Sequence, residues 1–291
     1  MNVGIIGGGA IGLLIAAHLY EEHEVSLYVR REEQRDKLVG NGICCSSLPN
    51  NAKPATHLFA EQKEEHDLVI ITVKQHHIST IIDNLKSEAP LLFLQNGMNH
   101  LDRLPCIPNP CLVGVVEHGA IKDNDSTVRH KGRGRIQLAA HHGIHSISNW
   151  AERLSTDKFP FLSKDDYYTM LAKKLVTNTV INPLTALFQV KNIMVIENPS
   201  IQLLAKKLCK EACQALDLTF LEEWEHIISV ATNTGDNQSS MLRDIMAGRE
   251  TEVDAICGYV ARLPHTESPH HEFVTEAIHA LEFQYHKGET L

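Results

Sequence analysis

Residues 3–17 of this 291-residue chain read VGIIGGGAIGLLIAA, and this stretch decides the fold. It has the form of a short apolar strand, a G-x-G-x-x-G turn and a helix with apolar residues at helical spacing. In a dinucleotide-binding turn, the first glycine permits the tight bend, the second lets the backbone approach a pyrophosphate, and the third allows close packing of the helix. The predicted contacts with the pyrophosphate are Gly7, Gly8, Gly9, Ala10, Ile11 and Gly12.

Two arginines follow the second predicted strand and indicate which nucleotide binds. The strand spans His23–Val29, and Arg30 and Arg31 stand at its end. An acidic residue at this place would hold the ribose hydroxyls of NAD, whereas two guanidinium groups suit a 2′-phosphate. The alternative is a solvated strand end at which Glu32 and Glu33 pair with the arginines. We expect NADP(H) rather than NAD(H).

Composition narrows the class of protein. A hydrophobic content of 43% suffices for one large or two medium domains, and a net charge of −9 without a long basic stretch argues against nucleic acid as a partner. No signal peptide or apolar stretch of membrane-spanning length is visible, so we expect a cytoplasmic protein that is not embedded in a membrane. The seven cysteines are expected to be free thiols. None of the 18 histidines stands in a metal-binding motif, so no metal is assigned.

The first half of the chain alternates between strand-like and helix-like segments. Asp67–Val73 is a continuous apolar run, typical of a buried parallel strand, and residues 126–130 and 135–140 resemble hairpin or edge strands. From Asp165 onward, helical periodicity dominates. The predicted fold class is α/β, an N-terminal Rossmann-type doubly wound sheet followed by an all-α C-terminal domain. We predict an NADP-binding domain at 1–164 and a helical substrate-binding domain at 165–291.

Polar residues at predicted strand ends are candidate ligands, because the carboxyl ends of parallel strands face the ligand crevice. Lys74 follows one buried strand, and Asn96 and Gly97 follow the next. We expect Lys74 to contact the cofactor and Asn96 to hydrogen-bond the nicotinamide or the substrate. The alternatives are a solvated lysine and ordinary turn residues.

A second group of candidates lies on a predicted helix over 167–188. Lys174, Asn178 and Asn182 are spaced by four, so they form one polar stripe, and Pro183 is expected to kink or end the helix. Because asparagine is a poor helix former unless its amide has a partner, the stripe favours ligand binding over a solvated face.

The third group lies in residues 239–254, which read SSMLRDIMAGRETEVD. The serines are suited to cap a helix, and Gly248 is suited to end one. The segment is therefore either helix punctuation or a source of substrate ligands, with Ser240 and Glu252 as the candidates.

Together these residues resemble the ketopantoate reductase (2-dehydropantoate 2-reductase) family over nearly the whole chain. The specific parts are residues 174–186 and 239–254, whereas the glycine turn is shared with many other proteins. The resemblance implies that NADPH reduces the ketone of 2-dehydropantoate to (R)-pantoate, on the route to pantothenate and coenzyme A. The chain departs from the family at Pro269-His270-His271, where a Pro-x-Asn turn is common.

The resemblance also implies roles for individual residues. Lys174 resembles the general acid, and Glu252 resembles the carboxylate that binds and orients the substrate. Asn178 and Asn182 would contact the hydroxyl end of the substrate, Ser240 its carboxylate, and Asn96 would lie beside the nicotinamide. The chemistry agrees, because a positioned ammonium stabilises and protonates the alkoxide that hydride transfer creates.

Two other functions remain open. One is a reductase of the same fold that acts on another 2-ketoacid, and the other is a non-catalytic NADP(H) sensor. Periodicity cannot separate core from an exposed apolar face of the helical domain, so a homodimer also remains open.

Overall fold

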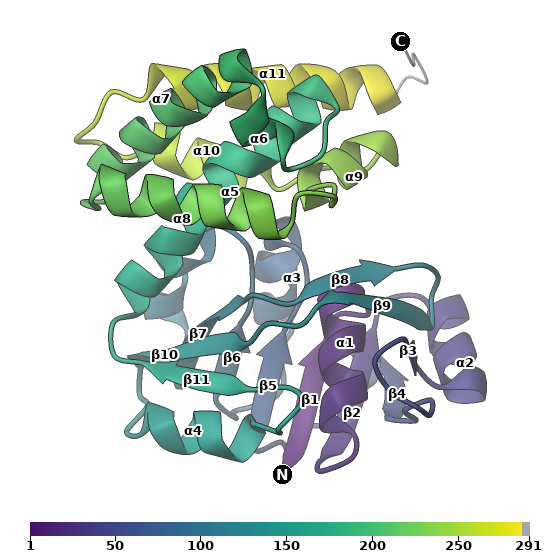
Figure 1. Ribbon diagram of the computed structural model, residues 1–291. Coiled ribbons are helices and arrows are strands. Elements are labelled where there is room, and N and C mark those ends of the chain that lie inside the picture. Colours follow the sequence, from purple (N-terminus) through teal and green to yellow (C-terminus); the bar gives the residue numbers. More distant parts are fainter. Residues whose placement is uncertain (287–291) are drawn as a thin grey trace. The chain divides into compact units, whose positions relative to one another are not determined.

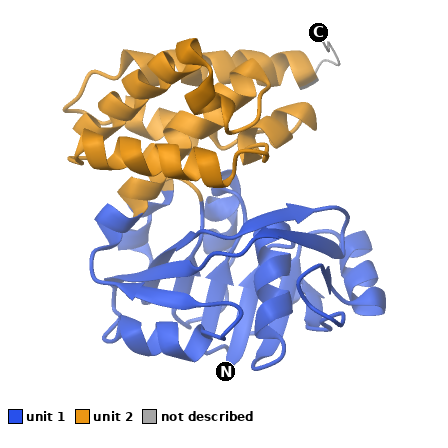
Figure 2. Ribbon diagram, viewed as in Figure 1, with its two compact units in different colours: residues 1–95, 100–170 blue, residues 96–99, 171–291 orange. Residues whose placement is uncertain are grey.

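The computed structural model describes residues 1–286, which fall into two compact units (Figure 2). Unit 1 contains Met1–Gln95 and His100–Met170, and unit 2 contains Asn96–Asn99 and the chain from Leu171 onward. The change between the units at Met170 lies within a long helix, a few residues after the boundary predicted between 164 and 165. The last five residues of the predicted second domain lie outside the described residues.

Unit 1 is built on an eight-stranded sheet with the order β11-β10-β7-β6-β5-β1-β2-β4 (Figure 1). Neighbouring strands are parallel except at the antiparallel β7–β10 pair. The predicted doubly wound sheet is therefore confirmed. The strands are β1 (Asn2–Ile6), β2 (Glu24–Val29), β4 (Ala55–Leu58), β5 (Leu68–Ile71), β6 (Leu91–Phe93), β7 (Cys111–Val116), β10 (Ile136–His142) and β11 (Phe161–Lys164).

A second sheet of three strands has the order β3-β9-β8, formed by Cys44–Cys45, Thr127–Gly132 and Gly119–Lys122. The prediction that residues 126–130 and 135–140 form hairpin or edge strands is confirmed for the first segment, which forms an antiparallel hairpin with β8, and is wrong for the second. The first segment is the central strand of the small sheet, and the second lies between β7 and β11 in the large one. The local pattern of a strand does not identify its partner, so the sequence did not show that β10 lies between β7 and β11.

The helices of unit 1 pack on these sheets. Helix α1 contacts β1 and β2 of the large sheet and also β8 and β9 of the small one, and its side chains from Leu13 to Ala17 are fully buried. Such a helix is apolar all round because sheets cover it on more than one side. The helices are α1 (Ala10–Leu19), α2 (Glu32–Asn41), α3 (Ile78–Asp83) and α4 (Ile147–Leu154), with short 3₁₀ turns at Phe59–Glu61, Gln75–His77, Asn99–Asp102 and Leu104–Cys106.

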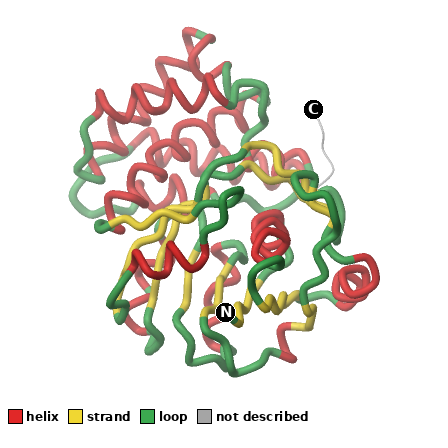
Figure 3. The backbone as a smooth tube through the Cα atoms, turned by 60° about the horizontal axis from the view of Figure 1, so that its bottom comes forward, coloured by secondary structure: helices red, strands yellow, loops and turns green. Residues whose placement is uncertain are grey.

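Unit 2 is helical, as predicted, and within the described residues the strands belong to unit 1 (Figure 3). None of the helices in residues 1–286 is both long and apolar enough to cross a membrane. The helices are α5 (Tyr167–Phe188), α6 (Met194–Glu197), α7 (Pro199–Ala215), α8 (Phe220–Asn233), α9 (Ser240–Met246), α10 (Val253–Ala261) and α11 (Pro269–His286).

Of the two outcomes predicted at Pro183, a kink or an end of the helix, the end is wrong, because α5 continues through Pro183 to Phe188. Proline lacks the N–H that would bond the carbonyl of Thr179, four residues earlier. That carbonyl instead accepts a weak hydrogen bond from the thiol of Cys257 on α10, at 3.9 Å. The neighbouring helix thus supplies a donor that the sequence of α5 lacks.

The departure at Pro269-His270-His271 has a structural role. The buried carboxylate of Glu211 on α7 accepts hydrogen bonds at 3.1 Å from the backbone N–H groups of His270 and His271, and both Nδ1 atoms also contact it. Burial tends to raise the pKa of Glu211, but the hydrogen bonds from both histidines hold it at about 2. The carboxylate therefore caps α11 and ties it to α7.

Candidate active site

The glycine turn lies where the order of the sheet changes direction. From β1 the chain proceeds to β2 and β4 on one side, whereas β5, β6 and β7 follow on the other. Gly7 comes directly after β1, and Thr72 comes directly after β5. Open α/β sheets bind ligands outside the carboxyl ends of the strands at this switch point.

The geometry around Gly7, Gly9 and Gly12 differs as their three predicted roles require. Gly7 has φ +118°, which a side chain would strain, and a Cβ on Gly12 would lie 1.9 Å from the carbonyl oxygen of Gly7. A Cβ on Gly9, in contrast, would meet nothing within 4 Å. Gly9 is the N-cap of α1, so the N–H groups of Ala10 and Ile11 have no acceptor within the helix. Open space before unpaired donors fits a pyrophosphate.

Gly8 connects the turn to residues that the sequence analysis missed. Its carbonyl oxygen accepts hydrogen bonds from Gln34 Nε2, at 2.8 Å, and from Lys122 Nζ, at 3.0 Å. Gln34 is a buried polar residue on an otherwise polar helix, and Lys122 ends β8 on the small sheet. The burial of Gln34 would have identified it as a residue of the site, but sequence alone does not show which polar side chains of a helix are buried.

The two predicted phosphate-binding arginines lie at the end of β2, beside this turn. Arg30 is exposed, and Arg31 is the N-cap of α2. Arg31 pairs with Asp125, which lies in the turn between β8 and β9, and with Glu33 at 3.8 Å. Of the two glutamates considered as alternative partners, Glu33 is thus within ion-pair distance, although the shorter contact is to Asp125.

Lys74 and its neighbours occupy the carboxyl ends of β5 and β6. Lys74 is half-buried and is the N-cap of the 3₁₀ turn Gln75–His77. The buried amide of Gln95 donates to the carbonyl oxygens of Ile71, at 2.9 Å, and Val73, at 3.1 Å. Gln95 therefore fixes the ends of the two strands, a role that the sequence analysis did not assign.

In unit 2, Asn96 and Glu252 come together although 156 positions separate them. Asn96 Nδ2 donates to Glu252 Oε2 at 3.0 Å. Gly97, at φ +79°, allows this approach, because a Cβ there would lie 2.1 Å from the carbonyl oxygen of Ala255. The amide thus orients one oxygen of the carboxylate.

The segment that carries Glu252 is held by α11. The backbone N–H of Thr251 donates to Glu282 Oε1 at 2.7 Å, and His279 contacts both Glu282 and Asp254 at 3.1 Å. Burial tends to lower the pKa of His279, but its two carboxylate partners raise it above the usual value. Glu282 and His279 therefore position the Glu252 segment, and nothing in the sequence pattern singled them out.

The predicted stripe on α5 is largely buried. Asn178 and Asn182 are each 7% exposed, and Lys174 is half-buried. Within residues 1–286, neither asparagine amide has a hydrogen-bond partner for its side chain. Neither residue is among those with fully buried, unpartnered side-chain atoms, so their amide ends still reach solvent and are open to a ligand or water. The burial contradicts a solvated helix face and favours a binding role.

The other two candidate elements contact α5. Cys257 of α10 meets α5 at Thr179, beside Asn178, and α10 begins directly after Glu252. Ser239 caps α9 by accepting from Leu242 N at 3.1 Å and accepts from the hydroxyl of Thr185 on α5 at 2.7 Å. Ser240 is the first residue of α9 and therefore lies next to the C-terminal part of α5.

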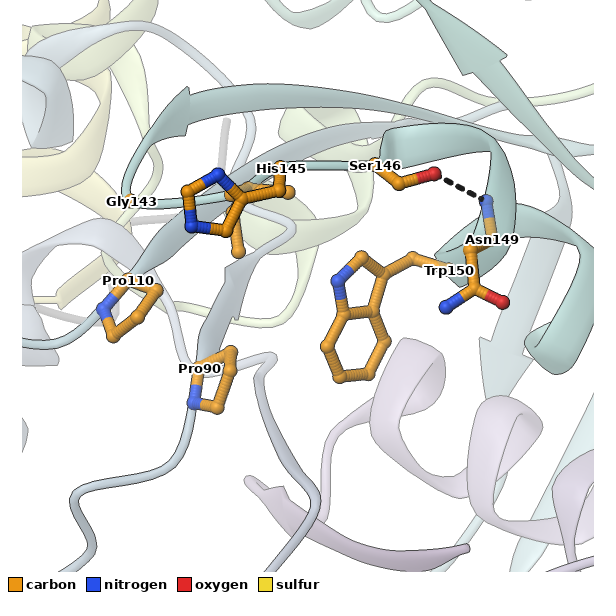
Figure 4. Close-up of a pocket in the computed structure, with 8 residues that line it drawn as sticks. Pro90, Pro110, Gly143, His145, Ser146, Asn149 and Trp150 are labelled. Carbon is orange, nitrogen blue, oxygen red and sulfur yellow. Dashed lines mark hydrogen bonds between the residues drawn. The ribbon is translucent and has the colours of Figure 1, made fainter.

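A cavity of about 260 Å³ in unit 1 does not coincide with any predicted site residue (Figure 4). Pro90 and Pro110 on its wall directly precede β6 and β7, so it lies at the amino ends of these strands. Its visible hydrogen bond, from Asn149 N to Ser146 Oγ, is the N-cap of α4. Ligands of open α/β sheets bind at the opposite strand ends, so this cavity is not the cofactor site.

Replacing Gly97 by alanine is expected to destabilise unit 2 more than replacing Gly248. Both glycines have positive φ, but a Cβ on Gly248 would meet only Tyr285 O, at 3.8 Å, whereas one on Gly97 would overlap the Ala255 carbonyl. Gly248→Ala therefore carries backbone strain of about 1 kcal/mol, and Gly97→Ala adds a steric clash for a total of about 3 kcal/mol or more. Urea unfolding measures both, and equal losses would show that the Ala255 contact yields freely.

Comparisons with known proteins match most of the chain. The family model "Ketopantoate reductase PanE/ApbA" matches residues 3–143, and "Ketopantoate reductase PanE/ApbA C terminal" matches residues 166–282. The chain is 37% identical to the 2-dehydropantoate 2-reductase of Bacillus subtilis over 97% of this chain and 98% of that protein. It is 40% identical to that of Listeria monocytogenes, with 88% and 89% covered.

Solved structures show the same fold. The crystal structure of probable 2-dehydropantoate 2-reductase from Bacillus subtilis aligns with a TM-score of 0.85 at 36% identity, covering 97% of this chain and 100% of that one. A ternary structure of D-mandelate dehydrogenase with NADH and anilino(oxo)acetate aligns with a TM-score of 0.91 at 20% identity, covering 98% and 100%.

Proposed function

This chain belongs to the ketopantoate reductase family, and we propose that it reduces 2-dehydropantoate to (R)-pantoate with NADPH in pantothenate and coenzyme A biosynthesis. The family consists of oxidoreductases that act on a small ketoacid. The observation that carries the proposal is the stripe on α5, where the largely buried Asn178 and Asn182 follow Lys174 by one and two turns and have amide ends without a partner in the described part of the chain.

The residues of the glycine turn fit NADP(H), the cofactor of the family, which supplies a hydride when it is bound. Gly7, Gly9 and the N-terminus of α1 would hold its pyrophosphate. Arg30 and Arg31 would bind the 2′-phosphate, which distinguishes NADPH from NADH. Lys74 and Asn96, at the ends of β5 and β6, would contact its nicotinamide side.

The residues of unit 2 would bind the ketoacid and move a proton. Lys174 holds the proton at Nζ and delivers it to the ketone oxygen as negative charge develops there. Glu252, oriented by Asn96, binds the substrate and fixes its position. Asn178 and Asn182 bind the hydroxyl end of the substrate. Ser240, the first residue of α9, binds the carboxylate of the substrate, which the positive N-terminal end of that helix also favours.

A reductase of another 2-ketoacid is the second candidate, because the fold is shared with D-mandelate dehydrogenase. A non-catalytic NADP(H) sensor is the third, although it has no use for a lysine and a carboxylate placed for catalysis. NADPH oxidation with 2-dehydropantoate, with 2-oxoisovalerate and with NADH as a control separates them. Fast turnover only with another ketoacid would replace the substrate, and cofactor binding without any turnover would support the sensor.

Arg31→Ala is expected to raise KM for NADPH roughly 10- to 100-fold, because charge-assisted hydrogen bonds contribute about 1.5–3 kcal/mol. KM for the ketoacid should stay near its wild-type value. Arg129→Ala is the matched control, since Arg129 pairs with Asp123 on the small sheet and lies outside the proposed site. Initial rates against NADPH measure the effect, and unchanged KM values in both Arg30→Ala and Arg31→Ala would refute the assignment.

The proposal also includes the oligomeric state and the cellular location of the protein. A solved ketopantoate reductase from Staphylococcus aureus with this fold, at 20% identity, is described as dimeric. We extend this to a homodimer of the present chain, which light scattering would measure directly. The predicted cytoplasmic location remains a prediction.

A further inference from the structure

Three cationic side chains converge on one carboxylate beside the glycine turn. Asp125 Oδ1 accepts from Arg31 and lies 3.3 Å from Lys122 Nζ, and Asp125 Oδ2 lies 3.2 Å from Lys37 Nζ. The cations come from the start of α2, the middle of α2 and the end of β8. All three cations and the Asp125 carboxylate that they contact belong to unit 1, so this unit alone fixes the place of the anion.

In a nucleotide-binding sheet, this place would lie near the 2′ position of a bound adenosine. Lys122 also donates to the carbonyl oxygen of Gly8, at 3.0 Å, so the cluster touches the glycine turn itself. Gln34 bridges the same carbonyl and the backbone oxygen of Asp125, at 2.8 Å and 3.1 Å. Arg31 follows β2, where nucleotide-binding sheets place the residue that reads the 2′ substituent.

The charges are not balanced. Three cations face Asp125 and the more distant Glu33, so the cluster keeps an excess of positive charge. Burial tends to raise the pKa of Asp125, but hydrogen bonds from Lys37, Arg31 and Lys122 hold it at about 2, so the carboxylate is ionised. A phosphate monoester, with a charge of about −1.5 to −2 and three acceptor oxygens, would use the same donors.

Asp125 lies in the turn between β8 and β9 and is 14% exposed. Its side chain can therefore turn away without breaking a strand. A phosphate at this place would repel the carboxylate and compete for its donors.

We propose that Asp125 is a built-in competitor of the 2′-phosphate, which occupies the cation cluster of Arg31, Lys37 and Lys122 until the phosphate displaces it. The inference rests on the proposed use of NADPH. Asp125 would weaken the binding of every ligand with a 2′-phosphate and leave ligands without one unaffected, so it would reduce the preference for NADPH over NADH. Lys122 and Lys37 become specificity-determining residues together with Arg31.

Calorimetric titration of the whole protein with nucleotides tests this role of Asp125. The probes are NADP⁺ and adenosine 2′,5′-bisphosphate, compared with NAD⁺ and 5′-AMP. Asp125→Asn is expected to tighten the first pair roughly tenfold and leave the second pair nearly unchanged. Asp123→Asn is the matched control, because it removes the same charge from the same turn but pairs with Arg129, and it should alter neither pair.

The possible results separate a failure of the proposed role of Asp125 from a failure of the proposed use of NADPH. Unchanged or weaker NADP⁺ binding in Asp125→Asn would overturn the competitor and leave NADPH as the cofactor. A protein that binds NAD⁺ as tightly as NADP⁺ both in the wild type and in Asp125→Asn would overturn the use of NADPH and the competitor together. Lys122→Gln provides a second test that does not depend on the folding of Asp125→Asn. It should weaken NADP⁺ binding roughly tenfold more than NAD⁺ binding, and equal losses would remove Lys122 from the cluster's function.

Discussion

Lys174→Ala is expected to lower kcat by about 10²- to 10⁴-fold, the usual contribution of a positioned general acid. Hydride transfer places negative charge on the ketone oxygen, and without the ammonium that charge is neither stabilised nor quickly protonated. NADPH binding should remain nearly intact, because the residues that would bind the adenosine half of the cofactor lie in unit 1. Single-turnover kinetics with saturating NADPH would measure the chemical step, and fluorescence titration would measure cofactor binding.

Lys173→Ala is the matched control for this variant. Lys173 is the preceding residue on α5, is exposed, and lies 3.6 Å from the buried carboxylate of Glu223 on α8. Its loss should reduce stability, since Glu223 would keep a buried charge without that partner, but kcat should stay near wild type. A Lys174→Ala variant with wild-type kcat, or equal losses of kcat in the two variants, would remove the catalytic role of Lys174.

The part of the fold that sequence predicts well is the part set by local sterics. At Gly12 any side chain would overlap the preceding turn, so the spacing of glycines carries the geometry directly. The continuous apolar run over β5 reflects burial on both faces of the sheet, which also acts locally. The partner strands of β9 and β10 were not predicted, because a local strand pattern does not show which strand lies beside it.

The candidate site shows the same division. The spacing of Lys174, Asn178 and Asn182 predicts a common helix face, but whether that face is buried depends on the helices packed around it. Contacts made over long sequence separations were not predicted. Arg31 and Asp125 are 94 positions apart, and Thr251 and Glu282 are 31 apart, so no spacing rule connects them. The predicted end of the helix at Pro183 was wrong for this reason too, because the donor near the carbonyl of Thr179 is Cys257 from another helix.

The stability of unit 1 is expected to fall by several kcal/mol as the pH drops from about 7 to about 4, because of a histidine cluster beneath the small sheet. His18 and His118 stack on the two faces of Phe159, with ring centroids 4.4 Å and 4.2 Å away. His118 Nδ1 accepts from Gly134 N at 3.1 Å and lies 3.0 Å from His130 Nε2. A proton on His118 Nδ1 would break this arrangement, so the folded state requires the neutral ring.

The direction of this change in stability with pH follows from the pKa values of His18 and His118. Burial, followed by repulsion from His130, lowers the pKa of His18 and His118 from 6.5 to about 4. Between these values the unfolded chain binds more protons than the folded one, so acid favours unfolding. The stabilisation is complete above pH 6.5 and is lost as the pH falls towards 4. A pKa lowered this far corresponds to about 3 kcal/mol for each histidine.

Urea unfolding at about pH 7.5 and about pH 5 tests this in the wild type and in His118→Asn. Asparagine cannot titrate but keeps an acceptor near the position of Nδ1, so the variant should lose stability at neutral pH and show a flatter pH dependence. His145→Asn is the control, since His145 is exposed in the same unit and its replacement should leave the pH dependence unchanged. If the wild type is equally stable at both pH values, the cluster tolerates its protons and the neutral-ring requirement is wrong.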